Sequence, residues 1–300
     1  MAGERPLAVG IVDLMGPPSG AASARMFSAL LEDAASRAGV PLRLTVLGGG
    51  PPAGGGPAPP DWDALAGQDA LVVTGAEPRT VRLEQDPVLE TVVRILETGG
   101  RLLSTLFSCL SAHAALHALH GAARSPLPRK RFGVFGHELA RPDHPLLAGL
   151  GGPVPVPHSR WNTVPADTFA GGAEVLLGLG GGEWHLAAGG GEDGLRHVFF
   201  QGHPEYRPDT LAREYRRDVR RYCEGATDRA PDLPLGCYTA ETRDRLHALA
   251  ARAAARRDPA LLGALPQRLD LRTAADWRVP AAVVARNWLT HLPLARKARR

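Results

Sequence analysis

The chain has 300 residues, of which 44% are hydrophobic and 22% charged, with a formal net charge of +4. This length allows one large α/β domain or two small ones, and the hydrophobic fraction is ordinary for a soluble globular protein with a sizeable core. No apolar run approaches the roughly 20 residues that a membrane-spanning helix requires. Residues 295–300 form a basic tail, but the modest net charge does not favour a nucleic-acid partner. We therefore expect neither a membrane nor a nucleic-acid partner.

Three cysteines, at positions 109, 223 and 237, form no CxxC pair and cannot all be joined in disulfides within the chain. Such cysteine usage favours a reducing compartment. Residues 1–7 show no charged and then apolar signal pattern. We therefore predict a cytoplasmic location.

The first half of the chain alternates predicted strands and helices. Apolar runs predict strands over 7–15, 41–47 and 69–74, and helical spacing of apolar residues predicts helices over 21–39 and 87–97. Strands separated by helices indicate parallel βαβ units and an α/β fold with a doubly wound, mostly parallel sheet. Residues 48–60, which contain only Gly, Pro and Ala, are predicted to form a flexible surface loop within the domain.

A change of pattern at Cys109 marks the next stretch, residues 101–121. The residues before Cys109 are typical of a buried strand, and an Ala/Leu/His helix that ends at Gly121 follows it. A strand that turns sharply into a helix presents a nucleophile above the sheet, and a helix N-terminus favours the thiolate form of a cysteine. Cys109 is therefore a candidate nucleophile, although a lone cysteine is often only a small buried apolar side chain. Because ligands bind at the carboxyl ends of such strands, the loops after Met15, Thr74 and Phe107 should surround one site.

The second half predicts short strands over 132–138 and 154–161 and antiparallel strands over 174–179, 183–188 and 197–200. A charged helix over 210–223 follows, and then, beyond a Pro-rich connection, helices over 239–257 and 279–292. We interpret residues 1–225 as the main domain and residues 226–300 as a C-terminal helical extension that packs on it.

The last of these strands leads into His203, and Glu205 follows two residues later. A histidine base and an orienting carboxylate on one tight turn complete a Cys-His-Glu triad with Cys109. A simple solvent-exposed turn is the alternative interpretation, but it leaves the upstream cysteine elbow unexplained.

Several motifs then occur together in one order and spacing. They are Phe132-Gly-Val-Phe-Gly-His137, His144-Pro-Leu-Leu147, Pro157-His-Ser-Arg160, Gly202-His-Pro-Glu-Tyr206, the 210–218 helix start and Asn287-Trp-Leu289. On these motifs the chain resembles the homoserine O-succinyltransferase and homoserine O-acetyltransferase family, which has a class I glutamine amidotransferase-like (flavodoxin-like) fold.

The resemblance implies acyl transfer from an acyl-CoA to the hydroxyl of L-homoserine, a step of methionine biosynthesis, by a ping-pong mechanism. Cys109 is then the nucleophile, His203 the base and Glu205 the third member of the triad. It also implies that acyl-CoA is a co-substrate, with no bound cofactor, and that the protein is a homodimer.

The same resemblance implies further substrate contacts. Lys130 would lie near the acyl group, Ser159 belongs with Arg160 to the Pro-His-Ser-Arg motif, and Arg217, one helical turn after Glu214, would bind the amino-acid carboxylate. An acyl-transfer intermediate also needs preorganised oxyanion donors, for which the backbone amides of Leu110 and Gly75 are candidates.

Arg79 occupies a position where Gly or Glu distinguishes succinyl- from acetyl-transferring members of the family. An arginine there favours succinyl-CoA over acetyl-CoA as the donor, because it can pair with the distal carboxylate. Homoserine O-acetyl transfer, another acceptor such as serine, and a non-catalytic relative remain alternatives. So does an amidotransferase-like amidase, although Ser108 and Ser111 flank Cys109 where that class has a Gly-x-Cys-x-Gly elbow.

The residues after Cys109 also depart from the family pattern, because His113 stands where the family has glutamine. His113, His117 and His120 share a helix face, which is one possible metal site. We predict instead that no metal binds, that His113 lines the pocket and that the other two pack or face solvent.

Overall fold

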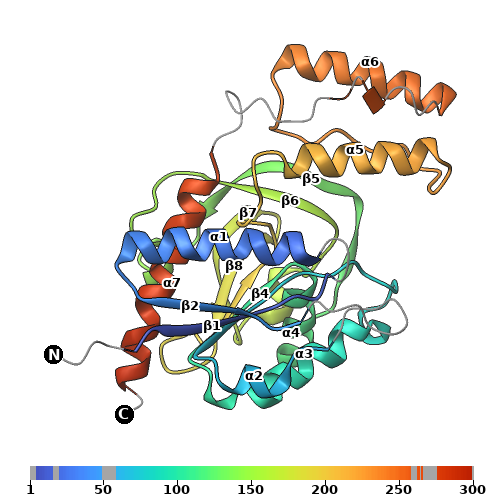
Figure 1. The fold of residues 1–300 in the computed structure, drawn as a ribbon. Helices are drawn as coiled ribbons and strands as arrows, with labels where there is room; N and C mark the ends of the chain where they lie inside the picture. The colour runs from blue at the N-terminus through green and yellow to red at the C-terminus, as the bar shows by residue number, and fades with distance from the viewer. Residues whose placement is uncertain are drawn as a thin grey trace.

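The computed structural model describes residues 5–15, 20–48, 59–257, 262–263, 265 and 276–298. Its strands form one mixed sheet in the order β2-β1-β3-β4-β9-β8-β7-β5-β6 (Figure 1). The strands are β1 (Leu7–Val12), β2 (Leu42–Val46), β3 (Ala70–Val73), β4 (Ser104–Ser108), β5 (Ser125–Leu139), β6 (Val154–Thr163), β7 (Glu174–Gly180), β8 (Glu183–Gly189) and β9 (His197–Phe200). The α-helices are α1 (Gly20–Ala38), α2 (Trp62–Ala66), α3 (Pro87–Thr98), α4 (Leu110–His120), α5 (Thr210–Cys223), α6 (Ala240–Arg256) and α7 (Arg278–Ala298).

Each helix and strand expected from the sequence has a counterpart in this order. Several differences concern length or existence, and β1, for example, ends at Val12 instead of residue 15. The one-turn helix α2, capped by the Asp61 side chain, was not predicted. Strand β5 begins at Ser125 instead of 132 because it pairs along β6 back to Thr163, and α7 continues through Pro293 to Ala298. Residues 49–58 of the predicted loop lie outside the described residues.

The sheet has a parallel part and an antiparallel part. Strands β2, β1, β3, β4 and β9 are mutually parallel, whereas β8, β7, β5 and β6 continue the sheet through antiparallel pairs. The expectation that β9 belongs only with antiparallel strands was incomplete, because β9 is antiparallel to β8 and parallel to β4. The register of the parallel pair sets Phe107 beside Phe199. The segments that follow β4 and β9 therefore leave the sheet at the same edge.

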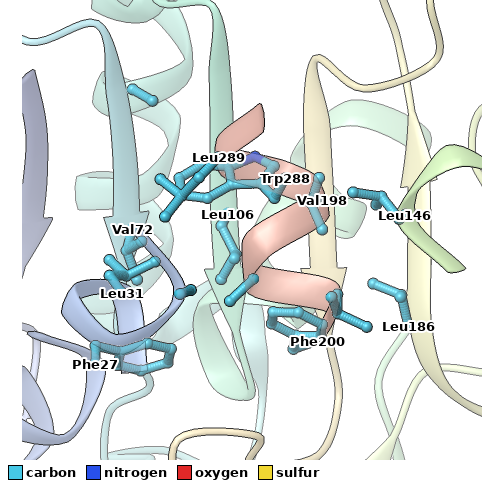
Figure 2. Close-up of a cluster of buried hydrophobic side chains, with 14 of the residues drawn as sticks. Phe27, Leu31, Val72, Leu106, Leu146, Leu186, Val198, Phe200, Trp288 and Leu289 are labelled. Atoms are coloured by element: carbon cyan, nitrogen blue, oxygen red, sulfur yellow. The ribbon is translucent and has the colours of Figure 1, made fainter. Parts of the chain in front are cut away.

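Helices cover both faces of the sheet, so its central strands are buried on both sides. In β3, Val72 faces a core cluster shared with α1 and α7, while Leu71 faces a second cluster shared with α3 and α4. This alternation follows from the two-residue period of a strand. Figure 2 shows Phe27 and Leu31 of α1 and Trp288 and Leu289 of α7 around the same face of the sheet.

The last described helix belongs to this core. The Trp288 indole is 1% exposed, and its Nε1 donates to Ser104 Oγ at 2.9 Å, directly on β4. Asn287 Nδ2 donates to the carbonyls of Leu146 and Ala148. Helix α7 therefore covers the same face of the sheet as α1, and the residues that it contacts there are far from it in the sequence.

Helices α5 and α6 lie together outside the layered body (Figure 1). A third apolar cluster, which includes Phe132, Tyr206, Tyr215, Leu246 and Trp277, joins them to β5 and to the segment after β9. The domain limits at 225 and 226 stay a prediction. No helix in the described part of the chain is long and apolar enough to cross a membrane.

Candidate active site

Cys109 lies at the point where β4 ends and α4 begins, as the change of sequence pattern predicted. Its backbone has φ 53° and ψ −113°, a conformation that is strained for a residue with a side chain. The Cys109 amide donates to the carbonyl of Phe200 at 2.7 Å, which joins the elbow to the end of β9. A strained backbone held in place by hydrogen bonds from neighbouring strands is typical of a nucleophile elbow.

Contacts from β3 hold the elbow in this conformation. The Ser111 hydroxyl lies 2.9 Å from the carbonyls of Val73 and Ser108 and accepts the Ser108 amide at 2.9 Å. Gly75 follows β3, and a Cβ placed there would lie only 3.3 Å from the Cys109 Cβ and 3.9 Å from the Leu110 nitrogen. Glycine thus lets the β3 loop approach the elbow closely, and the two amides predicted as oxyanion donors lie close to the cysteine.

His203 and Glu205 follow β9, directly beside this elbow. His203 Nδ1 lies 2.9 Å from Glu205 Oε1, and the Glu205 side chain is only 3% exposed. The His203 amide donates to the Pro157 carbonyl at 2.8 Å, which fixes the turn on β6. Because a carboxylate holds Nδ1 as the N–H donor, Nε2 is the ring nitrogen left for the hydrogen bond to Cys109.

The electrostatics of this turn favour the imidazolium form of His203. Burial lowers the pKa of His203, but electrostatic interactions and hydrogen bonds with Glu205 and Cys109 outweigh burial and raise the pKa well above its usual value. The Tyr206 ring also stacks on the imidazole, with centroids 4.2 Å apart. His203 therefore interacts with both Cys109 and Glu205, and these interactions raise its pKa.

Three buried histidines behind this turn were not predicted as site residues. The sequence signal was weak, since His137 and His158 occur only as members of the quoted motifs and His185 in none. His137 Nδ1 lies 3.1 Å from the Phe135 carbonyl, so it carries the proton, and His137 Nε2 accepts from His158 Nε2 at 3.2 Å. His185 Nδ1 accepts the Gly202 amide at 3.2 Å.

Burial lowers the pKa of all three rings, that of His137 to about 4. They are therefore neutral at physiological pH. Neutral rings with assigned tautomers support the turn at Gly202 and His203 without placing further positive charge beside it.

A cavity of about 1650 Å³ opens in front of Cys109. Its lining includes the predicted site residues Gly75, Cys109, Leu110, Lys130, Ser159, His203, Glu205 and Arg217. Arg79 is the exception. It is exposed, its backbone amide is bonded to Asp86 at 2.8 Å, and its side chain does not line the cavity.

Glu214 lies at the centre of the remaining predicted contacts. Its carboxylate accepts hydrogen bonds from the Ser159 hydroxyl and from Tyr206 and lies 3.9 Å from Lys130 Nζ. Asp218 pairs with Lys130 at 2.8 Å and with Arg217 at 3.0 Å. This wall offers both charge signs, which suits a zwitterionic amino acid.

His113 also lines the cavity, one helical turn beyond Cys109. Its Nε2 lies 3.3 Å from Gln201 Oε1, and burial lowers the pKa of His113 to about 3, so the ring is neutral. His117 instead bonds to the Ala122 carbonyl, and His120 packs against Gly172. Across the described residues, no three His, Cys, Asp or Glu side chains are grouped so that they could hold a metal ion.

The amino-acid sequence is similar to those of known proteins of one family. The family model for homoserine O-succinyltransferase matches residues 62–297. A homoserine O-succinyltransferase of Methylorubrum extorquens is 47% identical over 231 residues, which cover 75% of this chain and 68% of that protein. A homoserine O-succinyltransferase of Rhodopseudomonas palustris is 42% identical over 75% of this chain and 67% of that protein. A homoserine O-succinyltransferase of Thioalkalivibrio nitratireducens is 34% identical over 95% of this chain and 83% of that protein.

Solved structures give the fold. A glutamine amidotransferase of Thermotoga maritima superimposes with a TM-score of 0.54 at 15% identity, over 96% of this chain and 99% of that one. The class I glutamine amidotransferase-like fold expected from the sequence is thereby confirmed.

Proposed function

Because the chain belongs to the homoserine O-succinyltransferase family, we propose that it transfers a succinyl group from succinyl-CoA to the hydroxyl of L-homoserine, in methionine biosynthesis, through an acyl-enzyme on Cys109. The observation that carries this mechanism is the elbow at Cys109 beside the His203–Glu205 pair, at the edge of one large cavity.

In the first half-reaction, the Cys109 thiolate attacks the thioester carbonyl. A Cys109 Sγ–carbon bond forms, the carbon–sulfur bond to CoA breaks, and the departing CoA thiolate takes a proton from His203. One thioester replaces another, so the exchange is nearly balanced. The developing oxyanion is stabilised by the amides of Leu110 and Gly75, for which the close approach of Gly75 to Cys109 is the support.

Acylation also prepares His203 for the second half-reaction. Once Cys109 is esterified its negative charge is gone, and one of the causes that raise the pKa of His203 disappears. His203 is then deprotonated more readily, still oriented by Glu205. It can therefore act as the general base, a role worth roughly 10²–10⁴-fold in rate.

In the second half-reaction, His203 takes the proton of the homoserine hydroxyl. The oxygen attacks the acyl carbon, and the bond to Cys109 Sγ breaks. Arg217 is proposed to hold the amino-acid carboxylate and Glu214 its ammonium group, which agrees with the mixed charge of that wall. Lys130, which lines the cavity, is proposed to act near the acyl group. Arg79 does not line the cavity, so we do not propose it as a substrate contact.

Intact-protein mass spectrometry after incubation with succinyl-CoA alone tests the acyl-enzyme. We expect the mass to rise by one succinyl group, the adduct to map to Cys109, and homoserine to remove it. Cys109→Ala should lose the adduct, whereas Cys237→Ala, which removes a buried thiol away from the cavity, should keep it. Full transfer by Cys109→Ala would refute the mechanism.

A panel of acyl-CoAs crossed with homoserine and serine separates the proposed substrates from the acetyl and serine alternatives. The amidase alternative predicts ammonia release from glutamine, which we do not expect. We also propose a cytoplasmic location, which the three free cysteines support. The homodimer rests on the family resemblance, and light scattering of the purified protein tests it.

A further inference from the structure

The acyl donor raises a question that Arg79 does not answer, because its side chain lies outside the cavity. A succinyl group carries a distal carboxylate, and burying that charge requires a cationic partner. Two arginines that line the cavity have charges that act on Cys109, namely Arg124 and Arg160. Their present partners distinguish them.

Arg160 already has hydrogen-bond partners within the protein. Its guanidinium pairs with Glu183 Oε2 at 2.7 Å, donates to His158 Nδ1 at 3.2 Å and to the Asn162 carbonyl at 2.9 Å, and is buried. Glu183 also pairs with Arg131, but every nitrogen of the Arg160 guanidinium already has a partner, so Arg160 shapes the cavity and has little capacity for a second carboxylate.

Arg124 has no carboxylate within ion-pair distance among the described residues. One of its terminal nitrogens donates to the carbonyls of Thr80 and Val81, at 3.2 and 2.6 Å. Its Nε and its other terminal nitrogen have no hydrogen-bond partner in the described part of the chain, and neither is enclosed by protein atoms. These donors remain available to a ligand in the cavity.

The negative groups nearest Arg124 are used elsewhere. Asp86 accepts the backbone amides of Arg79, Thr80 and Val88, and Glu84 is half exposed. Their charges favour the cation, but burial outweighs them and lowers the pKa of Arg124. A half-buried guanidinium without a paired anion is poorly compensated, and a substrate carboxylate would compensate it.

The neighbours of Arg124 locate it at the acyl end of the cavity. Its two carbonyl partners belong to the loop that begins at Gly75, beside Cys109. Its charge also lowers the pKa of His113, one turn beyond Cys109 on α4. Lys130 and Arg217, by contrast, both pair with Asp218 and so already have a carboxylate partner.

We infer that Arg124 binds the distal carboxylate of the acyl group and so selects dicarboxylic acyl thioesters over simple fatty-acyl ones. This inference rests on the proposed acyl-enzyme at Cys109. Among the described residues, Nε and Nη1 of Arg124 have no partner, and either can donate a charge-assisted hydrogen bond to a carboxylate. An acetyl group would leave these donors unpaired.

The test is the first half-reaction alone, with no acceptor present, so that the homoserine carboxylate plays no part. The rate of CoA release and of Cys109 acylation is measured with succinyl-CoA and with butyryl-CoA, which has the same chain length but ends in a methyl group. The variants are Arg124→Met, Arg124→Lys and Arg79→Met. Arg129→Met, an exposed cation on β5 that does not line the cavity, is the matched control.

For Arg124→Met we expect the succinyl-CoA rate constant kcat/KM to fall about 10- to 100-fold, the worth of a charge-assisted hydrogen bond. Butyryl-CoA should react as fast as with the unchanged protein or faster, and Arg124→Lys should retain part of the preference. Arg129→Met should change neither rate.

An equal fall with both thioesters would overturn the inference, because it would indicate loss of loop structure and not of carboxylate binding. A selective loss in Arg79→Met without one in Arg124→Met would also overturn it. Failure of the unchanged protein to form any acyl-enzyme would instead refute the proposed function, so the two failures are distinguishable.

Discussion

The pairing of His203 with Glu205 is the feature whose removal should have the largest electrostatic consequence. In Glu205→Gln the side chain keeps nearly the same shape but loses its charge, 2.9 Å from His203 Nδ1 and almost fully shielded from solvent. The amide can still contact the ring. The variant therefore separates the charge of Glu205 from its steric role.

The magnitude follows from Coulomb's law. Two unit charges about 4 Å apart interact by about 4 kcal/mol at the effective dielectric constant of about 20 that describes partly buried protein sites. A loss of this size is equivalent to about three pH units in the pKa of a histidine. The variant should therefore lose most of the elevation of the His203 pKa, and kcat/KM should fall about 10²- to 10³-fold.

Stability should change with pH in a defined direction. Because the pKa of folded His203 is raised, its protonation stabilises the fold below the unfolded-state value near 6.5, and this stabilisation is lost as pH rises through the folded-state pKa. The melting temperature of Glu205→Gln should thus lie furthest below that of the unchanged protein near pH 6, and the gap should narrow at alkaline pH.

Two assays measure these effects, CoA release between pH 5.5 and 9.5 and thermal unfolding over the same range. Tyr206→Phe is a useful comparison, because it keeps the ring stacked on His203 and removes only the hydroxyl bonded to Glu214. If Glu205→Gln kept activity within about threefold with an unshifted pH profile, the electrostatic reasoning would be wrong.

Three further predictions concern geometry, charge and packing. Gly202→Ala places a Cβ 2.7 Å from Val156 Cγ1 and 2.9 Å from the Pro157 carbonyl, so we expect a loss of roughly 1–3 kcal/mol in the free energy of unfolding and a lower kcat; urea unfolding with steady-state kinetics checks both. Arg217→Met should raise KM for homoserine about tenfold or more while acylation by succinyl-CoA stays unchanged, and an equal loss in acylation would contradict the assignment to the acceptor. Trp288→Ala should cost about 3–5 kcal/mol in calorimetry, because the indole fills the core between α7 and the sheet and its N–H bonds to Ser104.

The sequence was sufficient for features that depend on local pattern. The change from strand to helix at Cys109 was visible because the two hydrophobic periods differ, and the three-residue spacing of Glu214 and Arg217 set both on one face of α5. The helix stop at Gly121 was also legible, and its φ of 67° is one that glycine adopts without strain.

Other features required the fold, because they arise from residues far apart in the chain. The sequence favoured Arg79 as the partner of the acyl carboxylate, yet its side chain lies outside the cavity that Arg124 lines, since Asp86 ties the Arg79 backbone into a surface turn. The cluster of His137, His158 and His185 comes from three strands, and no spacing along the chain reveals it.

By itself, then, the sequence determined the order of helices and strands, the elbow at Cys109 and the short turn that carries His203 and Glu205, because each depends on neighbours in the chain. Only the tertiary structure decided that β9 lies beside β4, which brings that turn to the elbow. Pairing between strands nearly a hundred residues apart depends on packing. The packing of the described residues also leaves Arg124 without a carboxylate partner, whereas Arg160 pairs with Glu183.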